Sequence, residues 1–153
     1  SRMFRRLPLI SGPMAYILGV LTAVLGLKKY RLKMKFNDSS EILEKDFLLS
    51  IFANGAFYGG GMKPVPKAKI DDGIMDFCLV EPVSRLKLLK FFPVYKKGEH
   101  GDMEEVFITT GKKVFVESEQ PFPLNIDGEV FTETKAEIEI FPDFLNVIIP
   151  VEF

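Results

Sequence analysis

The C-terminal part of the chain, from Glu104 onward, consists of short stretches in which apolar and polar residues alternate. Glycine, proline or aspartate separates these stretches, which read "EVFITTGKKVFVES", "FPLNIDGEVF", "KAEIEIFPD" and "LNVIIPVEF". Alternation with a period of two is typical of strands with one buried face, and the separating residues are typical of turns. Many short strands with a turn every few residues favour a β-sandwich or a barrel.

The N-terminal part continues this pattern and adds a helix. "KKYRLKMKFND" alternates as a half-buried strand, "DFLLSIFAN" is an apolar run of central-strand length, and "GIMDFCLVEPV" is another strand. "SRLKLLKFFPVYKKGE" predicts an amphipathic helix with Ser84 as its N-cap and with Pro93 disturbing its last turn. We therefore predict one mainly β domain over residues 1–153, an antiparallel sandwich or barrel-like fold with seven or eight strands and one or two helices.

An uncharged segment near the N-terminus, residues 7–27, allows two interpretations. Its 21 residues follow the basic "SRMFRR" and are long enough to span a bilayer. Pro8, Gly12 and Pro13 interrupt its first third, however, and leave a helix of 14 residues from Met14 to Leu27. That length is closer to a helix packed on a protein core, and a membrane-spanning or interfacial role is the alternative.

Composition excludes several classes of function. A formal net charge of −1 gives no general attraction to nucleic acid. Cys78 is the only cysteine and lies in an apolar run, which indicates a buried structural thiol and fits a reducing cytoplasm. His100 is the only histidine and lies in the polar, turn-like "KKGEHGD". The sequence therefore has no disulfide framework, no cysteine-rich zinc site, no multi-histidine metal site and no Cys/His triad.

The glycine-rich stretch "ANGAFYGGGMKPVPKAKIDDGIMDF", residues 53–77, does not have the pattern of a phosphate-binding loop. A Walker loop leads into a helix and places Ser or Thr after its lysine. Here Pro64 and Pro66 stand where that helix would begin, and no Ser or Thr follows Lys63. The stretch is better interpreted as a connection between strands that needs the conformational freedom of glycine.

Two Asp-Gly pairs, Asp72-Gly73 and Asp127-Gly128, lie between apolar residues and indicate hairpin turns. The second pair is followed at once by Glu129, at the start of a predicted strand. A carboxylate in this position can act as a general base if burial raises its pKa, or it can be a solvated edge residue. The residues alone leave both interpretations open.

Three segments together resemble a known family. "ANGAFYGGGMKPVPKAKIDDGIMDF", "PLNIDGEVF" and "AEIEIFPDFLNVIIP" resemble, in this order, the C-terminal half of bacterial diacylglycerol kinase-like lipid kinases, and "GPMAYILGVLTAVLGLKKYRLKMKFND" resembles the entry into that half. Such enzymes are similar to NAD kinases in having an N-terminal ATP-binding domain with a Gly-Gly-Asp-Gly-Thr motif. This motif is absent here, so the resemblance implies a C-terminal domain without its nucleotide-binding half, inactive by itself.

The resemblance also implies roles for particular residues. Asp72 matches the aspartate of a structural Mg²⁺ site, where carbonyl oxygens near Lys69 and Ile74 complete the ligands and Asp71 is a competing candidate. Glu129 matches the general base that takes a proton from a lipid hydroxyl as the hydroxyl attacks ATP. Asp127 would orient the turn or join a network of metal-bound water.

The implied function is that of a lipid kinase in phospholipid metabolism, with ATP and Mg²⁺ as cofactors and diacylglycerol as the default acceptor. We expect a cytoplasmic protein that contacts the membrane surface transiently, with no nucleic-acid partner. Exposed strand edges would favour a homodimer. Two alternatives are a non-catalytic β-sandwich that binds a lipid or acyl ligand, and a small protein anchored in the membrane by residues 7–27.

Overall fold

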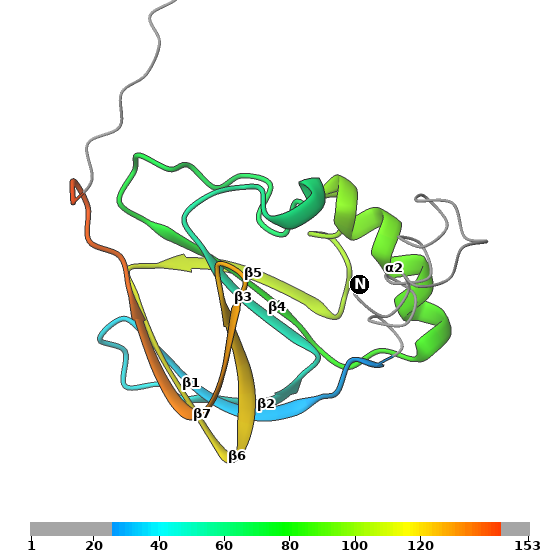
Figure 1. Ribbon diagram of the computed structural model, residues 1–153, viewed down its shortest axis with the longest axis horizontal. Coiled ribbons are helices and arrows are strands. Elements are labelled where there is room, and N and C mark those ends of the chain that lie inside the picture. Colours follow the sequence, from blue (N-terminus) through cyan, green and yellow to red (C-terminus); the bar gives the residue numbers. More distant parts are fainter. Residues whose placement is uncertain (1–25, 145–153) are drawn as a thin grey trace, which may run out of the picture.

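The computed structural model describes residues 26–144, which form two antiparallel sheets and an α-helix (Figure 1). The elements are β1 (Tyr30–Phe36), β2 (Leu43–Phe47), β3 (Leu49–Ala53), the 3-10 turn η2 (Gly59–Gly61), β4 (Met75–Val80), α2 (Arg85–Lys97), β5 (Val106–Gly111), β6 (Lys113–Ile126) and β7 (Glu129–Glu139). One sheet has the order β2-β1-β6-β7 and the other has the order β3-β4-β5. The predicted mainly β, antiparallel fold is confirmed, and its two sheets do not form a closed barrel.

Strand β4 lies at the centre of the molecule, and each of its residues is buried. Because successive strand residues point to opposite faces, β4 contributes to two separate clusters of apolar side chains. The first, which we call the inter-sheet core, comprises Leu32, Met34, Phe47, Met75, Phe77, Leu79, Val114, Val116 and Phe122. The second, the helix-side core, comprises Val65, Cys78, Val80, Leu88, Phe91 and Tyr95.

Helix α2 begins where the sequence predicts. The Ser84 hydroxyl caps its first turn by accepting a hydrogen bond from the backbone N–H of Lys87, at 3.3 Å. Gly98 ends the helix in a left-handed conformation, with φ of 79°. Pro93 was expected to disturb the last turn, yet the helix continues past it to Lys97. Burial of Tyr95 holds this last turn against the helix-side core.

Two predicted strands are each divided between the sheets. The run "DFLLSIFAN" was expected to form one central strand, but it breaks at Leu48 into β2 and β3. Strand β3 then lies at an edge of the three-stranded sheet, so the central position was wrong. The run "EVFITTGKKVFVES" breaks in the same way at Lys112. Here the Asn37 side chain accepts hydrogen bonds from the backbone N–H groups of Lys112 and Lys113, at 2.7 and 3.3 Å.

Two further predictions fall outside the described residues. They are most of the N-terminal helix, Met14 to Leu27, and the last predicted strand, "LNVIIPVEF". Between residues 26 and 144, no helix combines the length and the apolar character that a membrane span requires.

Candidate functional site

The turn between β6 and β7 is the tight hairpin that its Asp-Gly pair predicts. Asp127 and Gly128 both have positive φ, of 49° and 100°, as in a type I′ turn. The side chain of Asn125 accepts a hydrogen bond from the backbone N–H of Gly128 at 2.9 Å. Ile126 and Glu129 pair directly across the turn. The backbone therefore fixes Glu129 as the first strand residue after the turn.

The register of this hairpin determines which way Glu129 points. Phe122 is buried in the inter-sheet core, and Leu124 and Ile126 follow it on the same face because side chains alternate along a strand. Paired residues share a face, so Phe131 lies beside Leu124, and Glu129 lies beside Ile126. Glu129 itself is exposed. The carboxylate thus stands at the outer end of an apolar strip that extends from the core.

The second predicted site lies in the turn before β4, residues 69–74, which we call the Asp-loop. The Asp72 carboxylate accepts a hydrogen bond from the backbone N–H of Ile74 at 3.0 Å, which is an Asx turn. Gly73 has φ of 66°, and a Cβ there would lie 3.0 Å from the ring of Pro142. The Asp-loop is therefore held tightly against the chain that follows β7. Lys69 and Asp72 are exposed.

The structure adds Asp76, which the sequence reasoning did not single out. It is the second residue of β4 and only 7% exposed. Burial raises the pKa of its carboxyl group, and the nearby charge of Asp72 raises it further. Within residues 26–144, no hydrogen bond or ion pair satisfies this carboxylate. An aspartate inside the apolar run "IMDFCLV" was the signal that could have identified it.

The Asp-loop can be tested for its fit to the Mg²⁺ ion that the resemblance implies. Asp72 and Asp76 are close enough to interact electrostatically, and a cation would relieve their repulsion. No third acidic, histidine or cysteine side chain of the described chain joins them. Carbonyl oxygens and water would complete the coordination, as Mg²⁺ prefers. The donor set fits, with Lys69 and Ile74 as candidate carbonyl donors.

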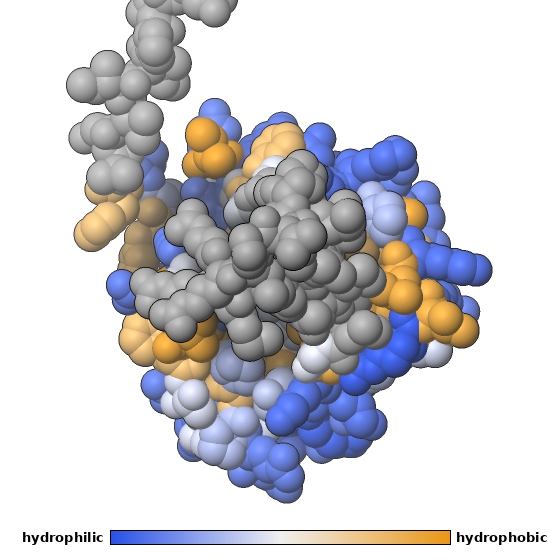
Figure 2. Space-filling model, turned by 45° about the vertical axis from the view of Figure 1, so that its right-hand side comes forward, coloured by the Kyte–Doolittle hydropathy of each residue, from blue (hydrophilic) through white to orange (hydrophobic). Residues whose placement is uncertain are grey.

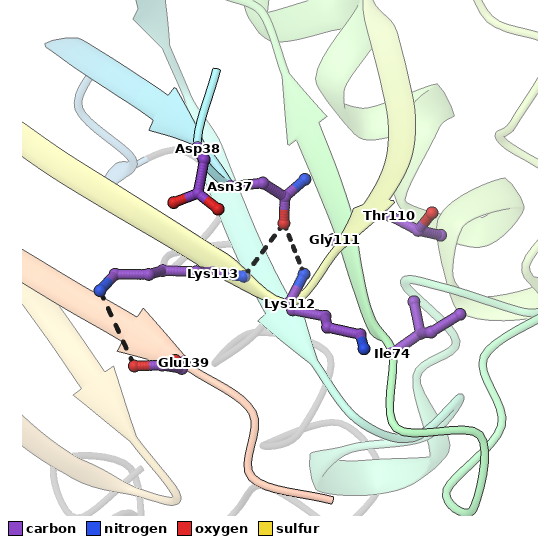
Figure 3. Close-up of a pocket in the computed structure, with 8 residues that line it drawn as sticks. All are labelled: Asn37, Asp38, Ile74, Thr110, Gly111, Lys112, Lys113 and Glu139. Carbon is purple, nitrogen blue, oxygen red and sulfur yellow. Dashed lines mark hydrogen bonds and ion pairs between the residues drawn. The ribbon is translucent and has the colours of Figure 1, made fainter. Parts of the chain in front are cut away.

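A pocket of about 590 Å³ adjoins the Asp-loop (Figure 3). Its lining residues are Asn37, Asp38, Ile74, Thr110, Gly111, Lys112, Lys113 and Glu139. The ammonium group of Lys113 lies 2.5 Å from the Glu137 carboxylate and 3.8 Å from that of Glu139. In Figure 3 the side chain of Lys112 points instead toward Ile74. The pocket therefore offers one ammonium group close to the Asp-loop.

The structure does not join the two predicted sites. Neither Asp127 nor Glu129 lines the pocket beside the Asp-loop. In the part of the chain that the structure describes, no hydrogen bond or ion pair connects the hairpin turn to Asp72. The arrangement offers a carboxylate at the end of an apolar strip and, separately, an acidic loop suited to a hard cation.

Comparison with known proteins places the chain in a family. Residues 1–149 match the model of the YegS C-terminal NAD kinase beta sandwich-like domain. A diacylglycerol kinase of Mycobacterium tuberculosis is 33% identical over 139 residues, covering 91% of this chain and 44% of that protein. A probable lipid kinase YegS-like protein of Shewanella frigidimarina is 28% identical, covering 89% of this chain and 43% of that protein. The chain belongs to the YegS C-terminal domain family, so the resemblance is confirmed.

Solved structures agree on the fold. A diacylglycerol kinase structure from Bacillus anthracis str. Sterne superposes with a TM-score of 0.60 at 18% identity, covering 81% of this chain and 44% of that one. The chain therefore spans less than half the length of the relatives it matches.

Proposed function

We propose that the chain is the lipid-substrate side of an ATP-dependent lipid kinase that phosphorylates a lipid hydroxyl, with diacylglycerol as the acceptor. The relatives named above are diacylglycerol or lipid kinases, which supports this reaction class. The observation that carries the proposal is the left-handed turn at Asp127 and Gly128, which presents Glu129 on the apolar face of its hairpin. A group that covers this face would remove water from Glu129 and favour its action as a base.

In this proposal Glu129 accepts the proton of the lipid hydroxyl, and Asp127 shapes the turn that holds it. Phosphoryl transfer depends mainly on positioning and on neutralising charge. Mg²⁺, when bound, supplies positive charge and holds the Asp-loop in one conformation. Asp72, Asp76 and the carbonyl oxygens of Lys69 and Ile74 would hold the ion. ATP would bind chiefly to the part of the longer protein that this chain does not include.

The proposed lipid substrate also indicates where in the cell the protein acts. A kinase whose acceptor resides in a bilayer must reach the membrane surface, so we propose a cytoplasmic protein that binds the membrane peripherally. Strand β7 forms one edge of the four-stranded sheet, and much of it is exposed. A second copy could pair at this edge to form a homodimer.

The decisive experiment measures transfer of labelled phosphate from ATP to diacylglycerol in mixed micelles. It uses the chain joined to the segment that precedes it in its gene, as wild type and as Glu129→Gln. We expect the variant to lose about a hundredfold in rate, because the amide cannot accept the proton. Glu133→Gln is the matched control, since Glu133 is exposed on the same strand face, and it should transfer at the wild-type rate.

Equal rates for wild type and Glu129→Gln would mean that Glu129 only builds the turn and that the base lies elsewhere. Failure of the wild type with every lipid tested would support the alternative, a non-catalytic sandwich that binds a lipid or acyl ligand.

A further inference from the structure

Helix α2 is rich in positive charge, as is the segment of residues 28–35 that includes most of β1. Its 13 residues, "RLKLLKFFPVYKK", include five basic side chains and no acidic one. The complete chain has a formal net charge of −1, so this charge is local. A helix with basic side chains and exposed apolar residues is a common form of membrane-surface contact.

The geometry of the helix separates its two faces. Leu88, Phe91 and Tyr95 are buried in the helix-side core and mark the inner face. At 3.6 residues per turn, the opposite side presents a second set of residues, which we call the α2 outer face. Its members are Leu86, Leu89, Lys90, Pro93, Lys96 and Lys97. Leu86 is 76% exposed and Leu89 is 37% exposed.

The basic residues of α2 differ in whether the protein already uses them. Arg85 donates a hydrogen bond to the carbonyl of Leu27 at 3.1 Å, and Lys87 forms an ion pair with Glu105. The three lysines of the α2 outer face, by contrast, form no ion pair or hydrogen bond with any described residue. Lys96 and Lys97 lie in the last turn, where the helix dipole favours cations. Lys90 lies in the middle of the helix, where that effect does not reach.

We propose that the α2 outer face binds the surface of a bilayer containing anionic phospholipid. The three unpaired lysines would meet lipid phosphates, while Leu86 and Leu89 would enter the boundary between headgroups and acyl chains. Leucines set among the lysines favour a lipid surface over nucleic acid, because phosphate contacts to DNA need no apolar side chains between them. Figure 2 brings forward the side of the molecule on which α2 lies, and the part of this side that is not grey shows hydrophobic and hydrophilic residues side by side.

This inference deepens the proposed function, because it names the surface with which a lipid kinase would approach its substrate. It can be tested without ATP or a lipid acceptor. Failure of vesicle binding and failure of phosphate transfer are therefore separate results.

The test is co-sedimentation of the 153-residue chain with lipid vesicles at physiological salt. Vesicles of phosphatidylcholine alone are compared with vesicles that also contain about one third phosphatidylglycerol. We expect binding only to the anionic vesicles, and roughly thirty-fold weaker binding for Lys90→Gln/Lys97→Gln. The matched control is Lys33→Gln/Lys35→Gln, which removes the same charge from β1 and should bind as wild type does.

A second pair of variants tests the apolar part of the contact. Leu86→Gln should weaken binding to the anionic vesicles at physiological salt, because it removes an apolar contact and leaves the charge of the helix unchanged. Ile42→Gln, at a residue that is 64% exposed and precedes β2, should have no effect.

Three results would overturn the proposal. They are equal binding to neutral and anionic vesicles, equal losses for the α2 and β1 lysine variants, and retention on a DNA oligonucleotide without vesicle binding. The last result would assign the α2 outer face to nucleic acid. Circular dichroism of each variant establishes that a loss of binding is not a loss of folding.

Discussion

The two cores that share β4 are built from different chemistry. The nine residues of the inter-sheet core are apolar, and the buried hydroxyl of Ser118, which follows Val116 on the same face of β6, donates to the carbonyl oxygen of Arg31 at 2.8 Å. The helix-side core also surrounds polar groups, because His100 is fully buried there and its ring lies against Tyr95, with centroids 4.9 Å apart. Apolar packing alone can hold the two sheets together. The helix-side core depends, in addition, on particular hydrogen-bond partners.

Those partners attach the proline-rich part of the glycine stretch to the end of α2. The Nε2 atom of His100 lies 2.9 Å from the carbonyl oxygen of Pro64, and the hydroxyl groups of Tyr58 and Tyr95 lie 3.0 Å apart. A Cβ at Gly98 would lie 3.0 Å from Pro66. The inter-sheet core thus supplies general stability, whereas the helix-side core holds the glycine stretch in one conformation.

The largest effect should follow from truncating the inter-sheet core. Phe77 has no exposed surface and packs against Phe36 and Phe52, with ring centroids 5.4 Å away in each pair. Phe77→Ala should lower the free energy of unfolding by about 3–5 kcal/mol, measured by urea denaturation, because it leaves a cavity between the sheets. Phe107→Ala removes a half-exposed ring from β5 and should cost less than about 1 kcal/mol. Similar losses for both would contradict the importance of this core.

The stability of the helix-side core, unlike that of the inter-sheet core, should depend on pH because His100 is buried in it. Burial lowers the pKa of His100, although the hydrogen bond to Pro64 opposes the shift. The carbonyl can only accept, so Nε2 carries the proton of the neutral ring, and the buried Nδ1 atom has no partner among the described residues. Protonation would place a second N–H there without an acceptor.

The direction of this effect follows from proton linkage. Between its lowered pKa and the ordinary value of 6.5, His100 binds more protons in the unfolded chain than in the folded chain. Stability should therefore fall as the pH drops below about 6.5. Burial raises the pKa of Cys78 to about 12 and also raises that of Tyr95, so neither neighbour titrates in this window.

The measurement is the free energy of unfolding as a function of pH for wild type and His100→Gln. The amide of glutamine can donate to Pro64 but does not titrate. We expect the wild type to lose stability relative to the variant in mild acid. Parallel pH profiles of the two proteins would show that protonation of His100 does not change the free energy of unfolding.

The smallest effect should come from one hydroxyl group. Tyr58→Phe leaves the buried hydroxyl of Tyr95 without its partner and should cost about 1 kcal/mol of unfolding free energy. Tyr30→Phe is the control, because no hydrogen bond of the Tyr30 hydroxyl is found within residues 26–144. If both substitutions lowered the free energy of unfolding equally, the hydrogen bond between Tyr58 and Tyr95 would not contribute to the helix-side core as proposed.

Local patterns in the sequence were sufficient for much of the fold and for one half of the candidate site. The alternation over β1, the Ser84 cap of α2 and the turn at Asp127 and Gly128 were all predicted and confirmed. The burial of Cys78 was also predicted and confirmed. Each depends on residues within a few positions of one another, where side-chain period and turn chemistry act. The roles of Glu129 and Asp72 remain predictions.

Only the tertiary structure decided how the strands divide between the sheets and which polar groups are buried. No residue pattern marks the break at Leu48, because apolar character continues through it, and Gly111 beside the break at Lys112 does not show that the chain passes there from one sheet to the other. His100 lies in a polar segment, yet packing against α2 buries it completely. Asp76 gains its raised pKa from burial and from Asp72 together. These properties arise from contacts between segments distant in the sequence, so local patterns cannot determine them.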